Sequence, residues 1–327
     1  KNSKKILLFQ NKKNIEIHPL WLRERVSNPE MLDKNNGQRL YEPSELNYNL
    51  KIKNALINKK KLNVKFSDGI ESEYLIKDLL KELNKNKHAN LYLWNSRIKK
   101  KPIFNYNAQM FNNKNGYDFL KSFYKYGFAI VKKATPQKNF IIKFAKSFGI
   151  VRTTNFGILF NVKSVRKATD LAYTSHALTA HTDNPYRKPI PGIQLLHCVK
   201  NDSEGGHSTL TDGFAVANFL KKKFPKFYKT LTNVKICFRY EDKSTFLENW
   251  GKTLELDEMG QIKRVRLSPR LDYVPVLSKG YLSKFYKARA FFIKLCNSKR
   301  FMIKFKLQPG DILVMDNYRT LHGRTAY

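Results

Sequence analysis

Acidic residues are scarce in this sequence, which has 26 Asp and Glu against 62 Lys and Arg and a formal net charge of +36. Such a charge favours polyanion binding. The basic residues are nevertheless spread along the whole chain, interleaved with asparagine, and accompany no recognised nucleic-acid motif. We interpret the charge as a solvated basic surface and do not expect nucleic acid as a partner, whereas heparin retention with a steep salt dependence would indicate a polyanion role.

Cysteine is also rare. Cys198, Cys237 and Cys296 are odd in number, widely spaced and embedded in apolar sequence. They are typical of buried thiols in a reducing compartment and exclude a disulfide framework or a zinc ribbon. No segment approaches the roughly 18 consecutive apolar residues of a membrane helix, and no apolar secretory segment precedes the charged start. The sequence therefore predicts a cytoplasmic protein with no membrane partner.

The hydrophobic content is 42% over 327 residues, enough for a large core in one large domain or two unequal ones. Residues 1–90 are β-prone and read as a small β-rich domain that ends in a polar stretch at 84–90. Residues 91–327 combine strands with flanking helices, which favours a barrel or jelly roll of antiparallel sheets. In this second domain the expected strands are 128–131, 193–199, 208–211, 234–238, 265–267 and 312–315, and the expected helices are 116–126, 139–148, 214–224 and 281–296.

An imidazole and a carboxylate lie two residues apart in His181-Thr-Asp183, within extended-chain sequence. Side chains two residues apart on a strand project from the same side, so both can reach one metal. His322 follows the apolar strand 312–315 and is the proposed third ligand. Two His and one carboxylate on one face of a metal suit a non-haem Fe(II) oxygenase. The alternative is a His and an Asp that only cap turns.

Four motifs in this order surround the three residues. They are His181-Thr-Asp183, Gly192-Ile-Gln-Leu-Leu-His-Cys-Val-Lys200, Gly205-Gly-His-Ser-Thr-Leu-Thr-Asp-Gly-Phe214 and Asp316-Asn-Tyr-Arg-Thr-Leu-His-Gly-Arg324. Together they resemble the γ-butyrobetaine and trimethyllysine dioxygenases, which are 2-oxoglutarate-dependent oxygenases of the taurine dioxygenase type. The likeness covers residues 117–327 and, more weakly, 18–25. It implies a double-stranded β-helix (jelly-roll) domain, Fe(II), 2-oxoglutarate and O2, with hydroxylation of an unactivated C–H bond.

The resemblance also suggests residues for the co-substrate. Ser208 matches a hydroxyl position that the family associates with 2-oxoglutarate, although an ordinary strand serine is the alternative. Family members place an arginine about a dozen residues beyond the distal histidine, whereas this sequence ends at Tyr327. We therefore expect a catalytic domain truncated at its C-terminus, in which Arg324 substitutes for that arginine or orients the His322 loop.

A trimethylammonium group is held by aromatic faces because it cannot donate hydrogen bonds. The resemblance places Phe156, Phe160 and Tyr173 at the matching positions, with core aromatics as the alternative. Asp170 resembles the trimethyllysine-type enzymes, whereas an arginine of the Arg264–Arg270 segment, with Arg270 as our choice, could bind a carboxylate or phosphonate.

Asp170 and Arg270 therefore give conflicting indications about the substrate. We favour γ-butyrobetaine as the quaternary-ammonium substrate over trimethyllysine and a trimethylammonium phosphonate. A catalytically silent homologue that acts as a binding protein is the alternative of a different class.

The first domain departs from the family, in which cysteines after a Trp-Leu-Arg motif and a later histidine hold zinc. Residues 26–31 here contain no cysteine, and 68–72 contain no histidine. A four-ligand zinc site cannot be assembled from these positions. We therefore expect no structural zinc and a first domain that assists homodimer formation or covers the active site.

Overall fold

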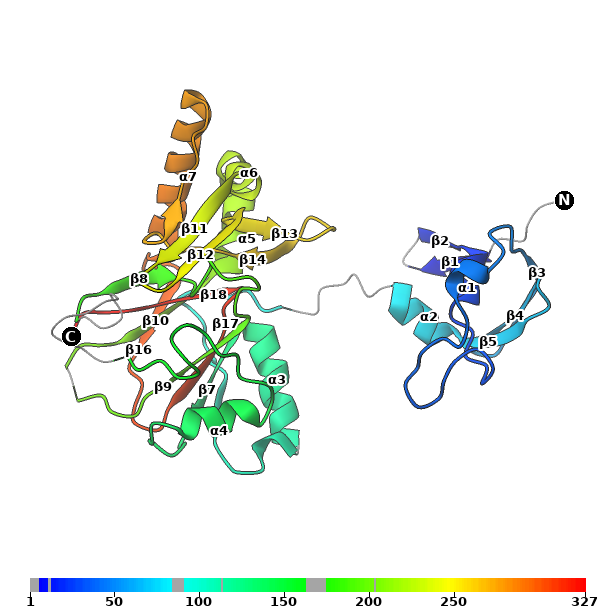
Figure 1. The fold of residues 1–327 in the computed structure, drawn as a ribbon, viewed down its shortest axis with the longest axis horizontal. Helices are drawn as coiled ribbons and strands as arrows, with labels where there is room; N and C mark the ends of the chain where they lie inside the picture. Colours follow the sequence, from blue (N-terminus) through cyan, green and yellow to red (C-terminus); the bar gives the residue numbers. More distant parts are fainter. Residues whose placement is uncertain (1–5, 11–12, 84–90, 113, 163–174, 203) are drawn as a thin grey trace. The chain divides into compact units, whose positions relative to one another are not determined.

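The computed structural model describes residues 6–10, 13–83, 91–112, 114–162, 175–202 and 204–327 (Figure 1). The chain divides into two compact units, Lys1–His88 and Ala89–Tyr327. The boundary expected at 84–90 lies outside the described residues, and so do Asp170 and Tyr173. Among the residues that the structure describes, no helix is both long and apolar enough to cross a membrane.

The first unit is built from two small antiparallel sheets and two helices. A hairpin of β1 (Ile6–Gln10) and β2 (Lys13–Ile17) precedes α1 (Pro19–Arg23) and the short 3-10 helix η1 (Pro43–Glu45). The strands β3 (Ile52–Asn58), β4 (Lys61–Phe66) and β5 (Glu71–Leu75) follow, and α2 (Ile76–Leu83) ends the unit. Leu62, Val64 and Phe66 alternate along β4 and are buried, so this face of the sheet forms the core.

Arg23 anchors α1 in the part of the first unit where the resemblance would place zinc. Its side chain is buried and donates a 2.8 Å hydrogen bond from Nε to Asp68. The guanidinium also lies 3.9 Å from the Met31 sulfur and 5.3 Å from the centre of the Tyr41 ring. These contacts join α1 to the turn between β4 and β5 and to the loop before β3. The expectation that this unit needs no zinc stays a prediction.

The second unit contains two four-stranded sheets that pack face to face. One has the order β6 (Ile103–Asn105), β7 (Phe128–Lys132), β17 (Ile312–Asp316) and β9 (Ile193–His197). The other has the order β16 (Met302–Phe305), β10 (Ser208–Asp212), β18 (Thr320–Arg324) and β8 (Leu178–His181). All neighbouring strands are antiparallel except β6 and β7. The expected mainly β architecture with flanking helices is thus confirmed.

Alternating side chains give the first of these sheets two buried faces. Phe128 and Ile130 of β7 point to a core shared with β10 and β16 of the opposite sheet. Ala129 and Val131 point the other way, toward α3 (Lys114–Tyr126) and α4 (Phe140–Lys146). The 3-10 helix η2 (Met110–Asn112) adds to this outer layer. Successive side chains of a strand face opposite sides, so a run such as Phe-Ala-Ile-Val is apolar throughout.

The second sheet is covered by helices α5 (Gly213–Lys223), α6 (Pro225–Asn233) and α7 (Lys279–Cys296). Beside them lie a sheet of β12 (Phe246–Lys252), β11 (Lys235–Glu241) and β15 (Asp272–Tyr273) and a hairpin of β13 (Leu254–Leu256) and β14 (Ile262–Val265). The expected strand 265–267 is therefore wrong beyond Val265. Leu267 instead accepts a 2.7 Å hydrogen bond from the backbone of Thr182.

Candidate metal centre

The pairing of β8 with β18 sets His181 directly opposite His322. Directly opposed residues of antiparallel strands have their side chains on the same face of the sheet, with Cβ atoms about 5 Å apart. The two imidazole ring centres are accordingly 4.4 Å apart. Two histidines separated by 141 positions in the sequence numbering are thus brought together by strand register alone.

The neighbours of each histidine explain why both rings face the space between the two large sheets. Ala180 precedes His181, and Leu321 precedes His322, and both belong to the apolar core under α5 and α7. His322 pairs across the sheet with Leu210, which packs into the core between the sheets. Because successive side chains alternate, the histidines must point to that same interior.

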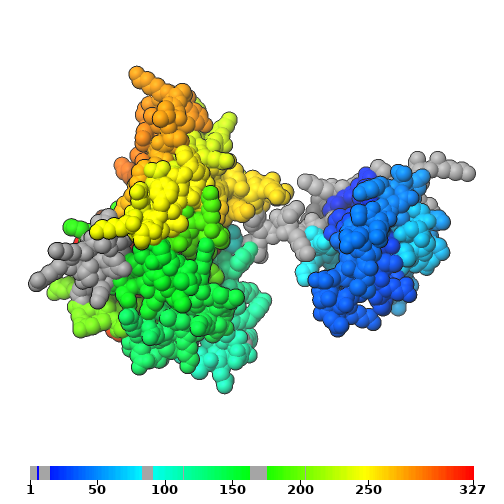
Figure 2. Space-filling model, viewed as in Figure 1, coloured from blue at the N-terminus to red at the C-terminus, as the bar shows by residue number. Residues whose placement is uncertain are grey.

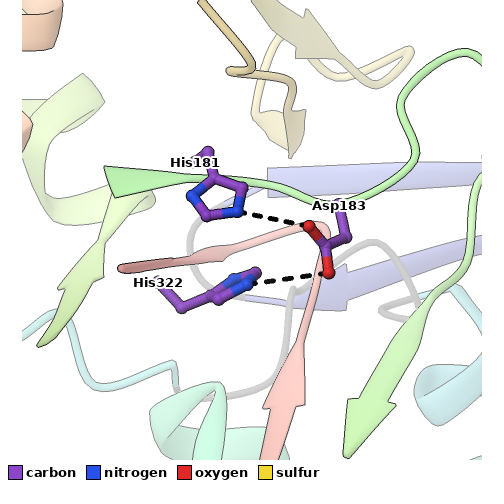
Figure 3. Close-up of side chains that lie close together, drawn as sticks. All are labelled: His181, Asp183 and His322. Atoms are coloured by element: carbon purple, nitrogen blue, oxygen red, sulfur yellow. Dashed lines mark ion pairs between the residues drawn. The ribbon is translucent and has the colours of Figure 1, made fainter. Parts of the chain in front are cut away.

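Asp183 lies just beyond the end of β8 and completes the group (Figure 3). One carboxylate oxygen is 3.3 Å from Nε2 of His181, and the other is 3.6 Å from Nε2 of His322. One donor atom from each residue lies within 4.8 Å of the others, and no further group of this kind occurs among the described residues. Metal bonds of about 2.1 Å at right angles place ligand atoms about 3 Å apart. The separations fit one ion held by three protein ligands.

Hydrogen bonds hold the first two ligands in place. Nδ1 of His181 lies 2.8 Å from the carbonyl oxygen of Thr179, so it carries the proton and Nε2 has a free lone pair. The Asn317 side chain accepts a 2.8 Å bond from the Asp183 backbone N–H and donates 2.9 Å bonds to the carbonyls of Asp183 and Pro191. The backbone of the second ligand is thereby fixed from the turn between β17 and β18.

Gln194 of β9 reaches the site from the opposite sheet. Its side-chain amide donates a hydrogen bond to Oδ2 of Asp183. This contact fixes the orientation of the carboxylate. Its role was missed at the sequence level, although a glutamine within the apolar run Ile-Gln-Leu-Leu was a signal that this side chain has a buried polar partner.

The protonation states suit metal binding. Burial raises the pKa of the Asp183 carboxyl, but His322, His181 and the Gln194 amide together lower it further, so the net pKa lies well below its usual range. Burial, and then the neighbouring His181, lower the pKa of His322 from 6.5 to about 4, with a smaller contribution from the Arg270 cation. At neutral pH the site therefore offers a carboxylate and a neutral His322 imidazole, which are the forms that bind a metal.

The model of the family "Taurine catabolism dioxygenase TauD, TfdA family" matches residues 95–327. The chain belongs to this family. It is 30% identical over 326 residues to γ-butyrobetaine dioxygenase of Homo sapiens, covering 94% of this chain and 83% of that protein. It is 25% identical over 328 residues to the mitochondrial trimethyllysine dioxygenase of Mus musculus, covering 94% of this chain and 76% of that protein. The predicted resemblance is confirmed.

Solved structures share the fold of this TauD/TfdA-family chain. A putative 2-oxoglutarate-dependent taurine dioxygenase from Burkholderia xenovorans superposes with a TM-score of 0.52 at 15% identity, covering 72% of this chain and 86% of that one. The non-haem iron oxygenase OrfP, in complex with Fe and 2-oxoglutarate, gives a TM-score of 0.51 at 14% identity, covering 70% and 89%. Together with the family match, the triad identifies a 2-oxoglutarate-dependent dioxygenase whose cofactors are iron and 2-oxoglutarate.

The chemistry of this dioxygenase divides between the cofactors and the chain. Bound iron and 2-oxoglutarate supply the oxidising power, whereas the protein positions the groups around them. His181, Asp183 and His322 occupy one side of the ion position, and the backbone contacts of Thr179 and Asn317 hold the first two in place. The apolar core between the sheets borders the His322 face and limits the access of water on that side.

The two residues expected to bind 2-oxoglutarate lie on the same face as His322. Ser208 pairs with Arg324 across β10 and β18, two residues from the Leu210 and His322 pair. The guanidinium of Arg324 donates a 3.0 Å bond to the His176 carbonyl and lies 4.7 Å from the centre of the Tyr327 ring. Their role in co-substrate binding stays a prediction, and their placement beside the metal ligands agrees with it.

Two of the aromatic residues expected to bind substrate pack together. The ring centres of Phe156 and Phe160 are 5.3 Å apart, and Phe156 lies 5.5 Å from Tyr240 of β11. Tyr240 stacks on Tyr186 at 5.1 Å, and Tyr186 follows Asp183 by three residues. We call Phe156, Phe160, Tyr186 and Tyr240 the aromatic cluster. Tyr186 and Tyr240 were not anticipated, because both lie far from residue 156 in the sequence.

The arginines of the 264–270 segment have different environments. Arg264 and Arg266 both bind the carboxylate of Glu255 across the β13–β14 hairpin. Arg270 has an exposed side chain whose charge contributes to lowering the pKa of His322. Of the three cations that could meet an anionic group near the metal, Arg270 is therefore the one whose charge acts on the triad.

We predict that Gln194→Ala lowers the affinity for a divalent metal about 10- to 100-fold, as replacements of groups that hold a ligand commonly do. The physical reason is that the Asp183 carboxylate loses the amide that orients it. Anaerobic titration calorimetry with Fe(II), or with Mn(II) as an ion less prone to oxidation, measures the change. Gln261→Ala removes an exposed glutamine amide and serves as the matched control. An unchanged affinity in Gln194→Ala would show that the contact does not matter.

Metal-free protein should lose stability as the pH falls from about 6.5 to 4. In this interval the unfolded His322 binds a proton, whereas the folded His322, with its pKa of about 4, does not. His322 contributes at most about 3 kcal/mol to this loss, and the lowered pKa of His197 acts in the same direction. The depressed pKa of Asp183 adds to the loss only at lower pH. Urea unfolding at several pH values measures this dependence. The pH dependence should be weaker in His322→Gln, and equal pH dependences in the wild type and His322→Gln would contradict the assignment.

Proposed function

We propose that this dioxygenase hydroxylates an unactivated C–H bond of a small quaternary-ammonium carboxylate, with γ-butyrobetaine as the preferred substrate. The observation that carries the proposal is the aromatic cluster next to the metal-binding segment. The relative with 30% identity is named a γ-butyrobetaine dioxygenase, and the alignment extends over 94% of this chain. The relative named for trimethyllysine is less similar, at 25% identity over the same share of this chain.

Aromatic faces are suited to a cation that has no N–H group. Phe156 meets both Phe160 and Tyr240 edge to face, so rings of different orientation converge in one place. A desolvated cation over such rings gains about 2 kcal/mol or more. Tyr186 links these rings to the metal site because its hydroxyl donates a 2.6 Å bond to the Asn184 side chain, next to Asp183. With the cation on these rings, we expect the target carbon to lie between the rings and the metal.

A cation near the metal ligands would favour a substrate that also carries a carboxylate. Arg270 is exposed and its charge acts on His322. A guanidinium matches a carboxylate with two parallel hydrogen bonds. An additional ammonium group, as in trimethyllysine, would be repelled by this cation. Arg270 thus supports γ-butyrobetaine over trimethyllysine.

Succinate formation with Fe(II), 2-oxoglutarate and O2 tests the proposal when γ-butyrobetaine is compared with 5,5-dimethylhexanoate. This compound replaces the trimethylammonium group by an uncharged tert-butyl group of the same shape. We expect its KM to be at least about tenfold higher because the cation–π contribution is lost. Trimethyllysine and a trimethylammonium phosphonate complete the panel. Succinate formation that no quaternary amine stimulates would contradict the substrate class but leave the dioxygenase assignment intact.

A variant pair locates the cation site. Phe156→Leu keeps an apolar side chain but removes the ring, so the KM for γ-butyrobetaine should rise while the KM for the uncharged analogue changes little. Phe246→Leu removes an exposed ring of β12 and is the matched control. Equal effects of Phe156→Leu on both compounds would assign Phe156 to packing alone.

A further inference from the structure

A cavity beside α5 has the chemistry of an anion site and takes no part in the function described above. Its volume is about 210 Å³. The lining comes from the segment that enters the second unit, from α5 and from the end of the α7 region, namely Leu93, Trp94, Asn95, Ala215, Asn218, Phe219, Lys222, Arg300 and Phe301. Two of these residues are cations, two are amides, and no carboxylate is present among them.

Arg300 is held in place by contacts that leave its hydrogen-bond donors available. Its guanidinium lies 4.3 Å from the centre of the Phe219 ring and 5.4 Å from that of Phe301. Its backbone carbonyl accepts bonds of 3.1 and 2.8 Å from the backbone and hydroxyl of Ser96. A planar cation stacked on rings is already oriented, so an arriving anion costs little side-chain entropy.

Other arginines of this unit form ion pairs with carboxylates. Arg239 binds Glu248, Arg289 binds Asp272 and Arg319 binds Asp212. Among the described residues, no carboxylate lies within ion-pair distance of Arg300 or of Lys222 in the structure. The cavity therefore holds two positive charges whose counterion is not supplied by the described part of the chain.

The amide of Asn95 adds an oriented donor. Its side-chain oxygen accepts a 2.9 Å hydrogen bond from the backbone N–H of Arg97. This bond fixes the amide and leaves its NH2 group as the donor. The adjacent Trp94 is fixed by hydrogen bonds from its backbone to Asp212 and from its indole to the Tyr126 carbonyl. The wall that carries Asn95 is thus rigid, and a rigid donor binds an anion better than a mobile one.

The surrounding surface concentrates anions at this place. Helices α5, α6 and α7 contain no Asp or Glu, whereas lysines recur on their exposed sides. Lys221, Lys223 and Lys226 lie close to Lys222 in the sequence, and α7 stands out on the surface of the unit (Figure 2). Like charges that surround a concave site raise the local concentration of anions and speed their association.

We propose that this cavity binds a phosphoryl group of a small anion, with Arg300, Lys222 and Asn95 as the donors. A volume of 210 Å³ equals about seven water molecules, which accommodates a phosphoryl group with a few attached atoms. The three terminal oxygens of a phosphate monoester match a guanidinium fork together with an ammonium and an amide. Free phosphate, a soluble phosphate monoester and a phospholipid headgroup share this chemistry.

Titration calorimetry of the full chain without iron or 2-oxoglutarate tests the site, so its outcome is independent of the oxygenase function. Inorganic phosphate and glycerol 3-phosphate are titrated at fixed ionic strength, and sedimentation with phosphatidic acid vesicles, compared with phosphatidylcholine vesicles, tests the lipid source. We expect saturable one-to-one binding of the soluble probes. Binding to the vesicles alone would assign the site to a headgroup, and binding to none of the probes would overturn the proposal.

Charge-matched variants separate a defined site from the general positive field. Arg300→Gln and Lys222→Gln should each raise the Kd for phosphate by about tenfold, the usual effect of one charge-assisted hydrogen bond. Lys299→Gln and Lys223→Gln remove the same charge from exposed neighbours that do not line the cavity, and should change the Kd less than about twofold. Arg300→Lys should give an intermediate value. Equal effects of all the glutamine variants would show diffuse attraction and refute the site.

Discussion

Asp183→Ala is expected to abolish 2-oxoglutarate turnover and to lower the affinity for Fe(II) by more than about a hundredfold, beyond the effect of losing a supporting contact. Asp183 is the anionic member of the triad, and its two oxygens face both imidazoles at 3.3 and 3.6 Å. Without it, two neutral imidazoles remain for the ion, and two adjacent histidines bind a hard divalent iron weakly. The substitution therefore removes both a ligand and the charge that favours the ion.

The measurement is anaerobic Fe(II) titration followed by succinate formation after addition of O2. Asp202→Ala is the matched control, because this carboxylate is exposed on the loop between β9 and β10 and pairs with the exposed Lys200. It should leave both quantities unchanged. Circular dichroism and thermal unfolding of the metal-free variants exclude a general loss of structure. Wild-type Fe(II) affinity in folded Asp183→Ala would contradict the assignment of the metal site.

The metal ligands could be predicted from the sequence, but the strand that carries one of them could not be recognised. Three ligands in two motifs are a local signal, since the residue types and spacing belong to the chemistry. β18 has the sequence Thr-Leu-His-Gly-Arg, whose glycine and charged end are not typical of a strand. Its pairing with both β10 and β8 makes it a central strand, and only this register places His322 opposite His181.

The partners of the ligands depend on contacts between distant segments and could not be predicted. Gln194 lies 11 positions from Asp183 but on the opposite sheet. β12 was not expected as a strand, because its inward-facing Asn249 breaks the apolar alternation. That amide is buried and donates a 2.7 Å bond to the Arg187 carbonyl. The role of a buried polar residue of this kind can be assigned only when its hydrogen-bond partner is known.

The ion pairs of Glu255 could have been predicted from the sequence. Arg264 lies nine residues after Glu255, and the turn residues Asp257 and Gly260 between them favour a hairpin. Such a hairpin sets Glu255 opposite Arg264, as the register of β13 and β14 shows. Arg264 and Arg266 therefore share one carboxylate, which holds both side chains at the hairpin and leaves Arg270 as the arginine of the motif without this contact.

Arg319→Met is expected to destabilise the second unit by about 3–5 kcal/mol, the cost of leaving a buried charge without its partner. The side chains of Arg319 and Asp212 are 1% and 0% exposed. The guanidinium donates to both oxygens of Asp212, at 3.1 and 2.7 Å, and to the carbonyls of Lys125 and Tyr92. Asp212 also caps α5 by accepting hydrogen bonds from two backbone N–H groups. One ion pair thus joins β10, α5, the β17–β18 turn and the segment that enters the unit.

Thermal unfolding should show this cost as a decrease of about 10 °C in the melting temperature of the second unit, given roughly 2–4 °C per kcal/mol for a domain of this size. Arg239→Met is the matched control, because its pair with Glu248 is about one third exposed and such surface pairs contribute little to stability. The double variant Arg319→Met/Asp212→Asn should recover part of the loss, since no buried charge is left unpaired. Equal effects of Arg319→Met and Arg239→Met would contradict the central role of the buried pair.

The same variant should also weaken the metal site, because Arg319 anchors the turn that holds Asp183. Asn317 lies two residues before Arg319 in this turn and clamps the Asp183 backbone with bonds of 2.8 and 2.9 Å. His322 follows Arg319 by three residues. Loss of the Arg319 contacts should therefore make the positions of both Asp183 and His322 less well defined. We expect the Fe(II) affinity of Arg319→Met to fall at temperatures where the unit is still folded. A wild-type affinity under those conditions would restrict the ion pair to stability.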